Sequence, residues 1–368
     1  MKKLWIVAVA SLVLLGLAGI VPCLRAGESK AVSRYQVLAP IRNGNLTIFP
    51  VVAESSHDTE QFLTLDEGLR SGDVVVTEAG SAGPLVRPRS GHPVWNEHPQ
   101  TGGAQVNRLV LINNSKRPLL LLAGEIVTGG KQDRIIGKDR LVPAESDPVD
   151  LSVFCVEPGR WVGASSKFGG IAAMVQPSVR AKAMADKDQQ KVWNQVAQSR
   201  SSMAEAVQGV GAATETVVIE QNSSYAAAVE NKVVKKQLDT VAAPVLQEYQ
   251  SVIRQLRDRH AVGVVVAVNG ELIWADVFAS SGLLEKYWPK LVRSYAAETF
   301  SQQGKSAAVD VRAAQEFLDR QDGRRQVVES EPGLYRHSET TGDGYKVFAL
   351  TSLLPSTGFD LHVAKMAE

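Results

Sequence analysis

A hairpin pattern in the second half of the chain most constrains the fold. Residues 261–268 form a valine-rich run, Asn269-Gly270 follows, and residues 271–278 form a second strand-like run. An Asn-Gly pair between two such runs is typical of the two-residue turn that joins antiparallel strands. Because successive side chains of a strand point to opposite faces, alternate valines of the first run are expected to face a core. We therefore expect an antiparallel sheet that this hairpin shares with the N-terminal strands.

Other strand patterns surround this hairpin on both sides. They occupy residues 46–52, 73–77, 106–112, 118–122, 333–337, 344–351 and 358–364. Helical patterns interrupt these strands without a regular alternation of single strands and helices, which indicates an α+β protein rather than a doubly wound sheet. We expect a β-rich sandwich or barrel-like body with an inserted helical segment and a C-terminal α/β portion.

The composition divides the chain into four parts. We assign residues 1–26 to a signal peptide, 27–161 to a β-rich N-terminal part and 162–259 to a helical insertion. Residues 260–368 contain the hairpin, further helices and the last strands, and we expect them to complete the body.

Helical periodicity dominates the middle of the chain. Apolar side chains recur on one face within residues 193–207 and again within residues 224–259. Pro244 is expected to kink or break the second helix, because proline lacks the backbone N–H that the helix needs. The glycine-rich residues 163–170 are expected to form a loop, and Ser281 is expected to cap the helix that follows the hairpin.

The N-terminus resembles an export signal. Two lysines precede the uncharged run 4–21, and Ala26 offers a cleavage point. The run is nearly long enough to span a membrane, so an uncleaved anchor that faces outward is the alternative. Lipid attachment at Cys23 is a third possibility, but Pro22 stands where a lipobox has a small residue. We expect a periplasmic or extracellular protein, which contacts the membrane only through residues 4–21 if the signal is retained.

Charge and composition exclude several functions. Lys and Arg number 40 against 39 Asp and Glu, so no basic excess supports nucleic-acid binding. Cys23 and Cys155 cannot build a disulfide scaffold or an all-cysteine zinc site, and Cys155 is expected to be a buried residue of a strand. His92 and His98 lie in a long loop at a spacing that fits no standard metal site. With no phosphate-binding loop or nucleophile elbow present, we expect no metal and no cofactor.

The densest polar cluster lies at residues 124–134. Glycines surround the polar residues, which are Glu125, Lys131, Gln132, Asp133 and Arg134. Such glycines let the backbone approach a ligand closely. An exposed turn would explain the cluster equally well. The functional interpretation is a site for an anion or a polyhydroxy compound, with Lys131, Gln132, Asp133 and Arg134 as ligand contacts and Glu125 as acceptor or base.

A second polar cluster follows the strand that contains Cys155. It consists of Glu157, Arg160 and Trp161, which could form a binding lip at the end of the strand. A structural Arg–Glu pair with Trp161 closing the core is the competing interpretation. Glu125 and Glu157 are the two candidates for a catalytic acid and base.

Several of these motifs resemble a bacterial domain family of unknown function. The matching runs are residues 120–125, 130–134, 192–193, 263–270 and 278–295. The family is named for its association with ADP-ribosylglycohydrolases and the rhodanese/phosphatase superfamily, and the resemblance covers roughly residues 35–300. It implies a role near ADP-ribose or NAD-derived metabolites, inferred from genomic company, with the two polar clusters as the positions at stake. An export signal departs from that expectation, because ADP-ribose metabolism is expected mainly in the cytosol.

Two functions remain open on this basis. The first is a non-catalytic protein outside the cytoplasm that binds a small polar or anionic molecule or a partner. The second is an enzyme that acts on a nucleotide-sugar or an ADP-ribose-like compound, and it requires Glu125, Arg134 and Glu157 to converge on one pocket.

Overall fold

The structure is a computed structural model, which describes residues 34–78, 107–160, 165, 167–301 and 308–368. The expected signal peptide at residues 1–26, the loop that contains His92 and His98, and Trp161 lie outside the described residues. Among the described residues, no helix has the length and apolar character needed to cross a membrane.

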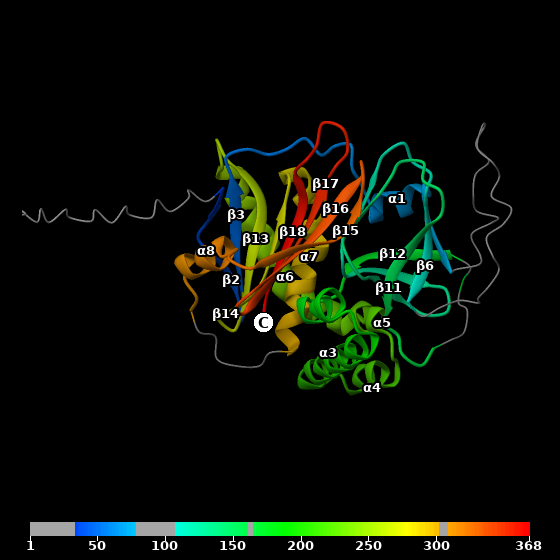
Figure 1. Ribbon diagram of the computed structural model, residues 1–368. Coiled ribbons are helices and arrows are strands. Elements are labelled where there is room, and N and C mark those ends of the chain that lie inside the picture. Colours follow the sequence, from blue (N-terminus) through cyan, green and yellow to red (C-terminus); the bar gives the residue numbers. More distant parts are fainter. Residues whose placement is uncertain (1–33, 79–106, 161–164, 166, 302–307) are drawn as a thin grey trace, which may run out of the picture. The chain divides into compact units, whose positions relative to one another are not determined.

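A large antiparallel sheet organises the described chain (Figure 1). Its strands run in the order β1-β3-β13-β14-β18-β17-β16-β15, and β2 pairs with β3. The strands are β1 (Tyr35–Val37), β2 (Ile41–Asn43), β3 (Leu46–Ala53), β13 (His260–Val268), β14 (Glu271–Phe278), β15 (Arg324–Glu331), β16 (Tyr335–Gly342), β17 (Tyr345–Ser352) and β18 (Asp360–Ala367).

The expected hairpin is present, and it joins the N-terminal strands. β13 and β14 pair antiparallel, with Val268 opposite Glu271. Asn269 and Gly270 have φ angles of 53° and 83°, the left-handed conformations that a two-residue hairpin turn requires. On its other side β13 pairs antiparallel with β3, more than 200 residues earlier in the chain, and Val266 faces Ile48 there.

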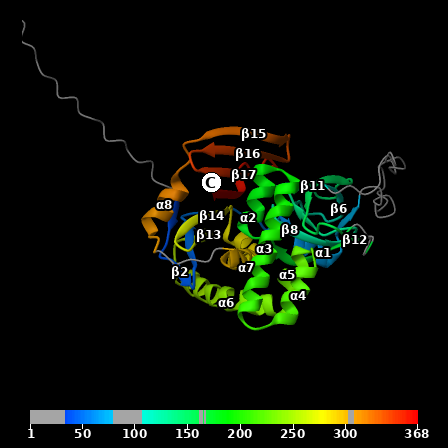
Figure 2. The ribbon, with the colours of Figure 1, turned by 90° about the horizontal axis from the view of Figure 1, so that it is seen from below.

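Both faces of the sheet are packed at β13, where alternate side chains belong to two different apolar clusters. Val264, Val266 and Val268 belong to the core shared with the helices α6 (Lys232–Gln255) and α7 (Ser281–Ser301). Val265 and Ala267 pack instead in a second cluster with α8 (Val311–Asp319). Figure 2 shows β13 and β14 between α7 on one side and α8 on the other.

Five further helical segments lie within residues 177–230, before α6 in the chain, and most of their buried apolar side chains belong to the core that α6 and α7 share with the sheet. They are α2 (Pro177–Ala181), the π-helical segment η2 (Lys182–Asp186), α3 (Gln189–Gly209), α4 (Ala213–Gln221) and α5 (Tyr225–Glu230).

A closed six-stranded barrel forms the second β structure. Its strands follow the order β11-β6-β5-β12-β8-β9 around an interior of buried aliphatic side chains. They are β5 (Val74–Glu78), β6 (Arg108–Asn113), β8 (Glu125–Gly129), β9 (Arg134–Ile136), β11 (Val149–Cys155) and β12 (Lys167–Met174). A small sheet of β10 (Arg140–Val142), β7 (Leu119–Leu121) and β4 (Leu63–Thr64) accompanies it. The helix α1 (Leu65–Ser71) begins with a capping box between Thr64 and Glu67.

The α+β expectation and the barrel-like body are confirmed. The expected loop at residues 163–170 is wrong from residue 167 onward, because those residues begin β12 and pair with β5 and β8 to close the barrel. The range 162–259 therefore contains a barrel strand in addition to its helices. Within the range 27–161, β1–β3 belong to the large sheet and the later strands mainly to the barrel.

Two local expectations, a break at Pro244 and a cap at Ser281, are also corrected, and one strand was not predicted. The helix α6 continues through Pro244, and the carbonyls of Thr240 and Val241 accept hydrogen bonds from the Asn43 amide at 3.0 and 2.9 Å. The hydroxyl that caps α7 belongs to Ser280, which accepts from the Leu283 N–H at 3.0 Å, so Ser281 is already helical. The edge strand β15 escaped notice because it is exposed along nearly its whole length and shows no apolar alternation.

Candidate functional site

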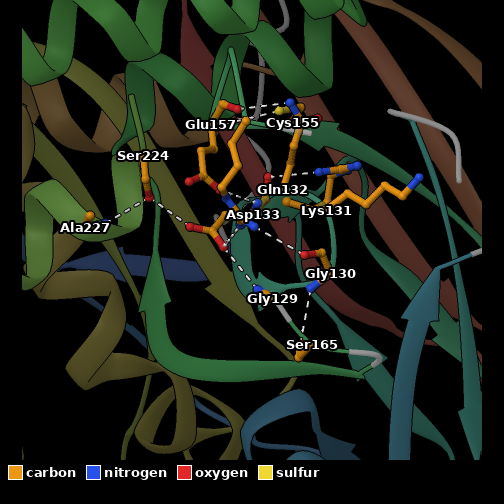
Figure 3. A network of polar contacts seen from close by, with 12 residues as sticks. Gly129, Gly130, Lys131, Gln132, Asp133, Cys155, Glu157, Ser165, Ser224 and Ala227 are labelled. Carbon is orange, nitrogen blue, oxygen red and sulfur yellow. Dashed lines mark hydrogen bonds and ion pairs between the residues drawn. The ribbon is translucent and has the colours of Figure 1, made fainter. Parts of the chain in front are cut away.

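One end of the barrel carries the predicted polar cluster (Figure 3). The turn from β8 to β9 contains Gly129 and Gly130, which have φ angles of 125° and 52°. A side chain at Gly130 would meet the Phe168 ring, because an added Cβ would lie 2.2 Å from that ring. These glycines therefore permit both the turn and its close approach to β12.

Asp133 is the centre of this cluster. Its carboxylate accepts hydrogen bonds from the Gly129 N–H at 3.1 Å and from the Ser224 hydroxyl at 2.8 Å. Its own N–H donates to the Glu157 carboxylate at 3.0 Å. Ser224 also accepts from the Ala227 N–H, so the same hydroxyl caps α5. Asp133 thus ties the turn to the end of β11 and to the helical layer, and burial raises its pKa.

Arg160 closes this arrangement. Its guanidinium lies 2.6 Å from the Glu157 carboxylate and 3.5 Å from that of Asp133, and it donates to the Gly130 carbonyl at 3.3 Å. The hydrogen bond to Glu157 raises the pKa of Arg160. Gln132 donates to the Glu157 carbonyl at 3.1 Å. The Glu157 carboxylate is therefore engaged by both the Asp133 N–H and the Arg160 guanidinium.

The remaining cluster residues differ in exposure. Arg134 is completely buried on β9, and burial lowers its pKa. Lys131 is partly exposed, and its N–H donates to the Glu78 carboxylate at 2.8 Å. The predicted ligand contacts that keep some exposure are Lys131 and Arg160, whereas Gln132, Asp133 and Arg134 are buried.

Glu125 lies in a different network. It is buried at the start of β8, where it pairs with the Lys290 ammonium of α7 and accepts from the Leu122 N–H at 2.6 Å. Lys290 also lies 2.6 Å from Asp66. No described contact joins Glu125 to Glu157, so the structure does not bring the two candidate carboxylates together as an acid–base pair.

A pocket of about 440 Å³ lies on the outside of the barrel beside α1. β12 pairs with β5 only at Lys167 and Phe168, and beyond these residues its described partner is β8. The pocket occupies this opening and is lined by Arg70, Lys167 and the exposed Gly169 and Gly170, among others. No sequence pattern indicates this pocket, because its two halves are about 100 residues apart and neither half has a distinctive motif.

A buried ionic network was also missed. His362 of β18 lies 2.6 Å from Asp139 and 3.0 Å from Asp276, and all three side chains are fully buried. Arg180 of α2 donates to both oxygens of Asp276 at 2.9 and 3.0 Å. Burial by itself would lower the pKa of His362, but the two carboxylates raise it to about 9. The network joins the large sheet to α2 and to the turn between β9 and β10.

Comparison with known proteins gave one match. A family model of the ARPP-1 domain, described as ARG and Rhodanese-Phosphatase-superfamily-associated Protein domain, matches residues 34–363. This is the family that the sequence motifs resemble, so that resemblance is confirmed. No curated protein and no solved structure matches the chain.

Proposed function

Because the chain belongs to the ARPP-1 family, whose function is uncharacterised, we propose a function from its own pockets: it is a binding protein that takes a small anionic ligand outside the cytoplasm. The binding site is the pocket between α1 and β12. The observation that carries the proposal is that two cationic residues, Arg70 and Lys167, both line this pocket.

Both cations are available to a ligand. Arg70 and Lys167 are exposed, and within the described part of the chain neither forms an ion pair. The pocket's carboxylate, Asp66, is already engaged by Lys290. A guanidinium and an ammonium from separate elements favour an anionic group between them. The volume of about 440 Å³ falls within the range of small-molecule sites.

The polar cluster at the barrel end supports one wall of this pocket. Phe168 lines the pocket and lies against Gly130. Gly130 in turn is held by Arg160, whose guanidinium is anchored by Glu157 and Asp133. In this proposal Gln132, Asp133 and Arg134 position the wall from inside the protein, Arg160 holds the turn, and Lys131 adds a partly exposed cation.

The location outside the cytoplasm rests on residues 1–26, whose two lysines, apolar run and Ala26 resemble an export signal. An enzymatic role is not proposed. A general acid or base must lie within hydrogen-bond distance of the proton that it transfers. Glu125 is instead paired with Lys290, and Glu157 is paired with Arg160.

Thermal unfolding of the purified protein with phosphate, citrate, ADP-ribose or glucose tests the proposal. We expect at least one anion to raise the melting temperature and glucose to leave it unchanged, because a ligand that binds only the folded state stabilises it. The double variant Arg70→Gln/Lys167→Gln should lose most of that rise.

The matched control is Lys236→Gln/Arg257→Gln, which removes two exposed cations away from the pocket. It should respond to the anion as the unmodified protein does. An equal loss in both double variants would indicate a general charge effect, and no response to any anion would refute the proposal.

A further inference from the structure

A second cavity, separate from the anion pocket, lies between the barrel and the large sheet. It has a volume of about 330 Å³. Its lining comes from the turn after β9, from β11, from η2 and from the strands β15–β17. Cavities between packed structural units are common places for small-molecule sites.

His337 is the distinctive residue of this cavity. It lies on β16, lines the cavity and is only 2% exposed. Neither ring nitrogen has a hydrogen-bond partner among the described residues. His362, which is also fully buried, has a carboxylate at each nitrogen. A buried polar group without a hydrogen-bond partner destabilises the folded protein. The two ring nitrogens of His337 are therefore positions where a bound ligand would form hydrogen bonds.

The charges around the cavity are already compensated. Lys138 pairs with Glu329, and Lys187 lies 2.6 Å from Glu339. Burial lowers the pKa of His337, so its ring is neutral at pH 7 and offers one donor and one acceptor. A charged ligand would have to break an ion pair or enter without a counter-charge, which is unfavourable.

The remaining lining suits a flat apolar body. Phe154, Phe348 and Met184 contribute to the walls, and aromatic and thioether groups pack well against a ring. Met184 belongs to η2, and single π-helical turns occur often at functional sites.

We propose that this cavity is a second ligand site, which binds a small, uncharged, planar molecule whose amide-like edge hydrogen-bonds to His337. The required features are a ring, a donor and an acceptor on one edge, and no net charge. The site shares no lining residue with the anion pocket.

Three ligands of similar shape test these features in calorimetric titrations of the full chain. Benzamide has a ring, a donor and an acceptor; benzoate has a second acceptor in place of the donor and carries a negative charge; toluene has the ring alone. We expect benzamide to bind at least about tenfold more tightly than either of the others, because one hydrogen bond and one avoided buried charge each contribute on that scale. Binding by none of the three, or toluene binding as tightly as benzamide, would overturn the proposal.

Two variants locate the binding. His337→Phe keeps a ring of similar size but removes both nitrogens, and it should weaken benzamide binding roughly tenfold; His260→Phe, at an exposed histidine, should not. Val328 lines the cavity and is 39% exposed, so Val328→Trp should fold and block the cavity. Its neighbour Val327 is 55% exposed and does not line the cavity, which makes Val327→Trp the matched control.

Unchanged benzamide affinity in both His337→Phe and Val328→Trp would place any binding elsewhere and refute the site. If His337→Phe fails to fold, the comparison of the two valine variants decides alone. A shift of the His337 ring ¹⁵N resonances on adding benzamide should accompany binding. Arg70→Gln/Lys167→Gln should leave benzamide affinity unchanged, so the two proposals succeed or fail separately.

Discussion

At the scale of single residues, Arg134 has a structural role at the barrel end. Its side chain is completely buried, and the neighbouring acidic groups Glu78 and Asp133 interact with its charge. We expect Arg134→Ala to lower the free energy of unfolding by about 2–5 kcal/mol, because the change empties the space of a large, completely buried side chain and removes a charge that interacts with Glu78 and Asp133. Chemical denaturation measures this loss. Lys131→Ala, at a partly exposed side chain, should cost less than about 1 kcal/mol. A small loss for Arg134→Ala together with weaker anion binding would instead assign Arg134 to the ligand.

At the scale of elements, the continuity of α6 depends on a side chain from β2. Pro244 provides no N–H for the Thr240 carbonyl, and the Asn43 amide donates to that carbonyl and to the next one. We expect Asn43→Ala to destabilise the protein by about 1–3 kcal/mol, since it leaves these carbonyls without that donor. Hydrogen exchange within residues 232–255 should become faster. Pro244→Ala restores the backbone donor, so Asn43→Ala should cost less in that background, and an equal cost in both backgrounds would contradict this account.

At the scale of the whole molecule, His362 makes the attachment of the barrel-side turn to the large sheet sensitive to pH. Its pKa is about 9 in the folded protein, above the value of about 6.5 for an unperturbed histidine. Protonated His362 therefore stabilises the folded protein by about 3 kcal/mol. This stabilisation is complete below pH 6.5 and is lost as the pH rises through about 9. Denaturation from pH 6 to pH 10 should show this decline in the unmodified protein but not in His362→Gln.

Lys365 provides the main competing titration, since burial lowers its pKa to about 8. The contribution of Lys365 to stability has the opposite sign, because the folded state gains stability as the pH rises from about 8. Both proteins contain Lys365, so its contribution cancels when their pH profiles are compared. Parallel pH profiles for the unmodified protein and His362→Gln would show that folding does not raise the pKa of His362.

Local periodicity predicted much of the element content. The Asn269-Gly270 turn, the apolar faces of α3 and α6, and the buried Cys155 follow from spacing and turn chemistry, which act over a few residues. The α+β class follows from the order of these elements, and the family resemblance rests on motifs that are visible in the sequence alone. Of the predicted cluster at residues 124–134, the part from residue 129 onward is one spatial group with Glu157 and Arg160, whereas Glu125 lies in another network.

Only the tertiary structure decided which distant segments meet. The glycine-rich residues from 167 onward form β12 because β5 and β8 provide hydrogen-bond partners for their backbone. These partners lie far away in the sequence, so local propensity does not predict the strand. Glu125 belongs with Lys290 rather than with Glu157 because α7 places Lys290 beside the start of β8. Nothing in the sequence distinguishes His337 from His362. Packing nevertheless leaves His337 beside a cavity, without a hydrogen-bond partner among the described residues, and places His362 between two carboxylates. Burial and pairing depend on the whole fold, so residue spacing alone could not distinguish them.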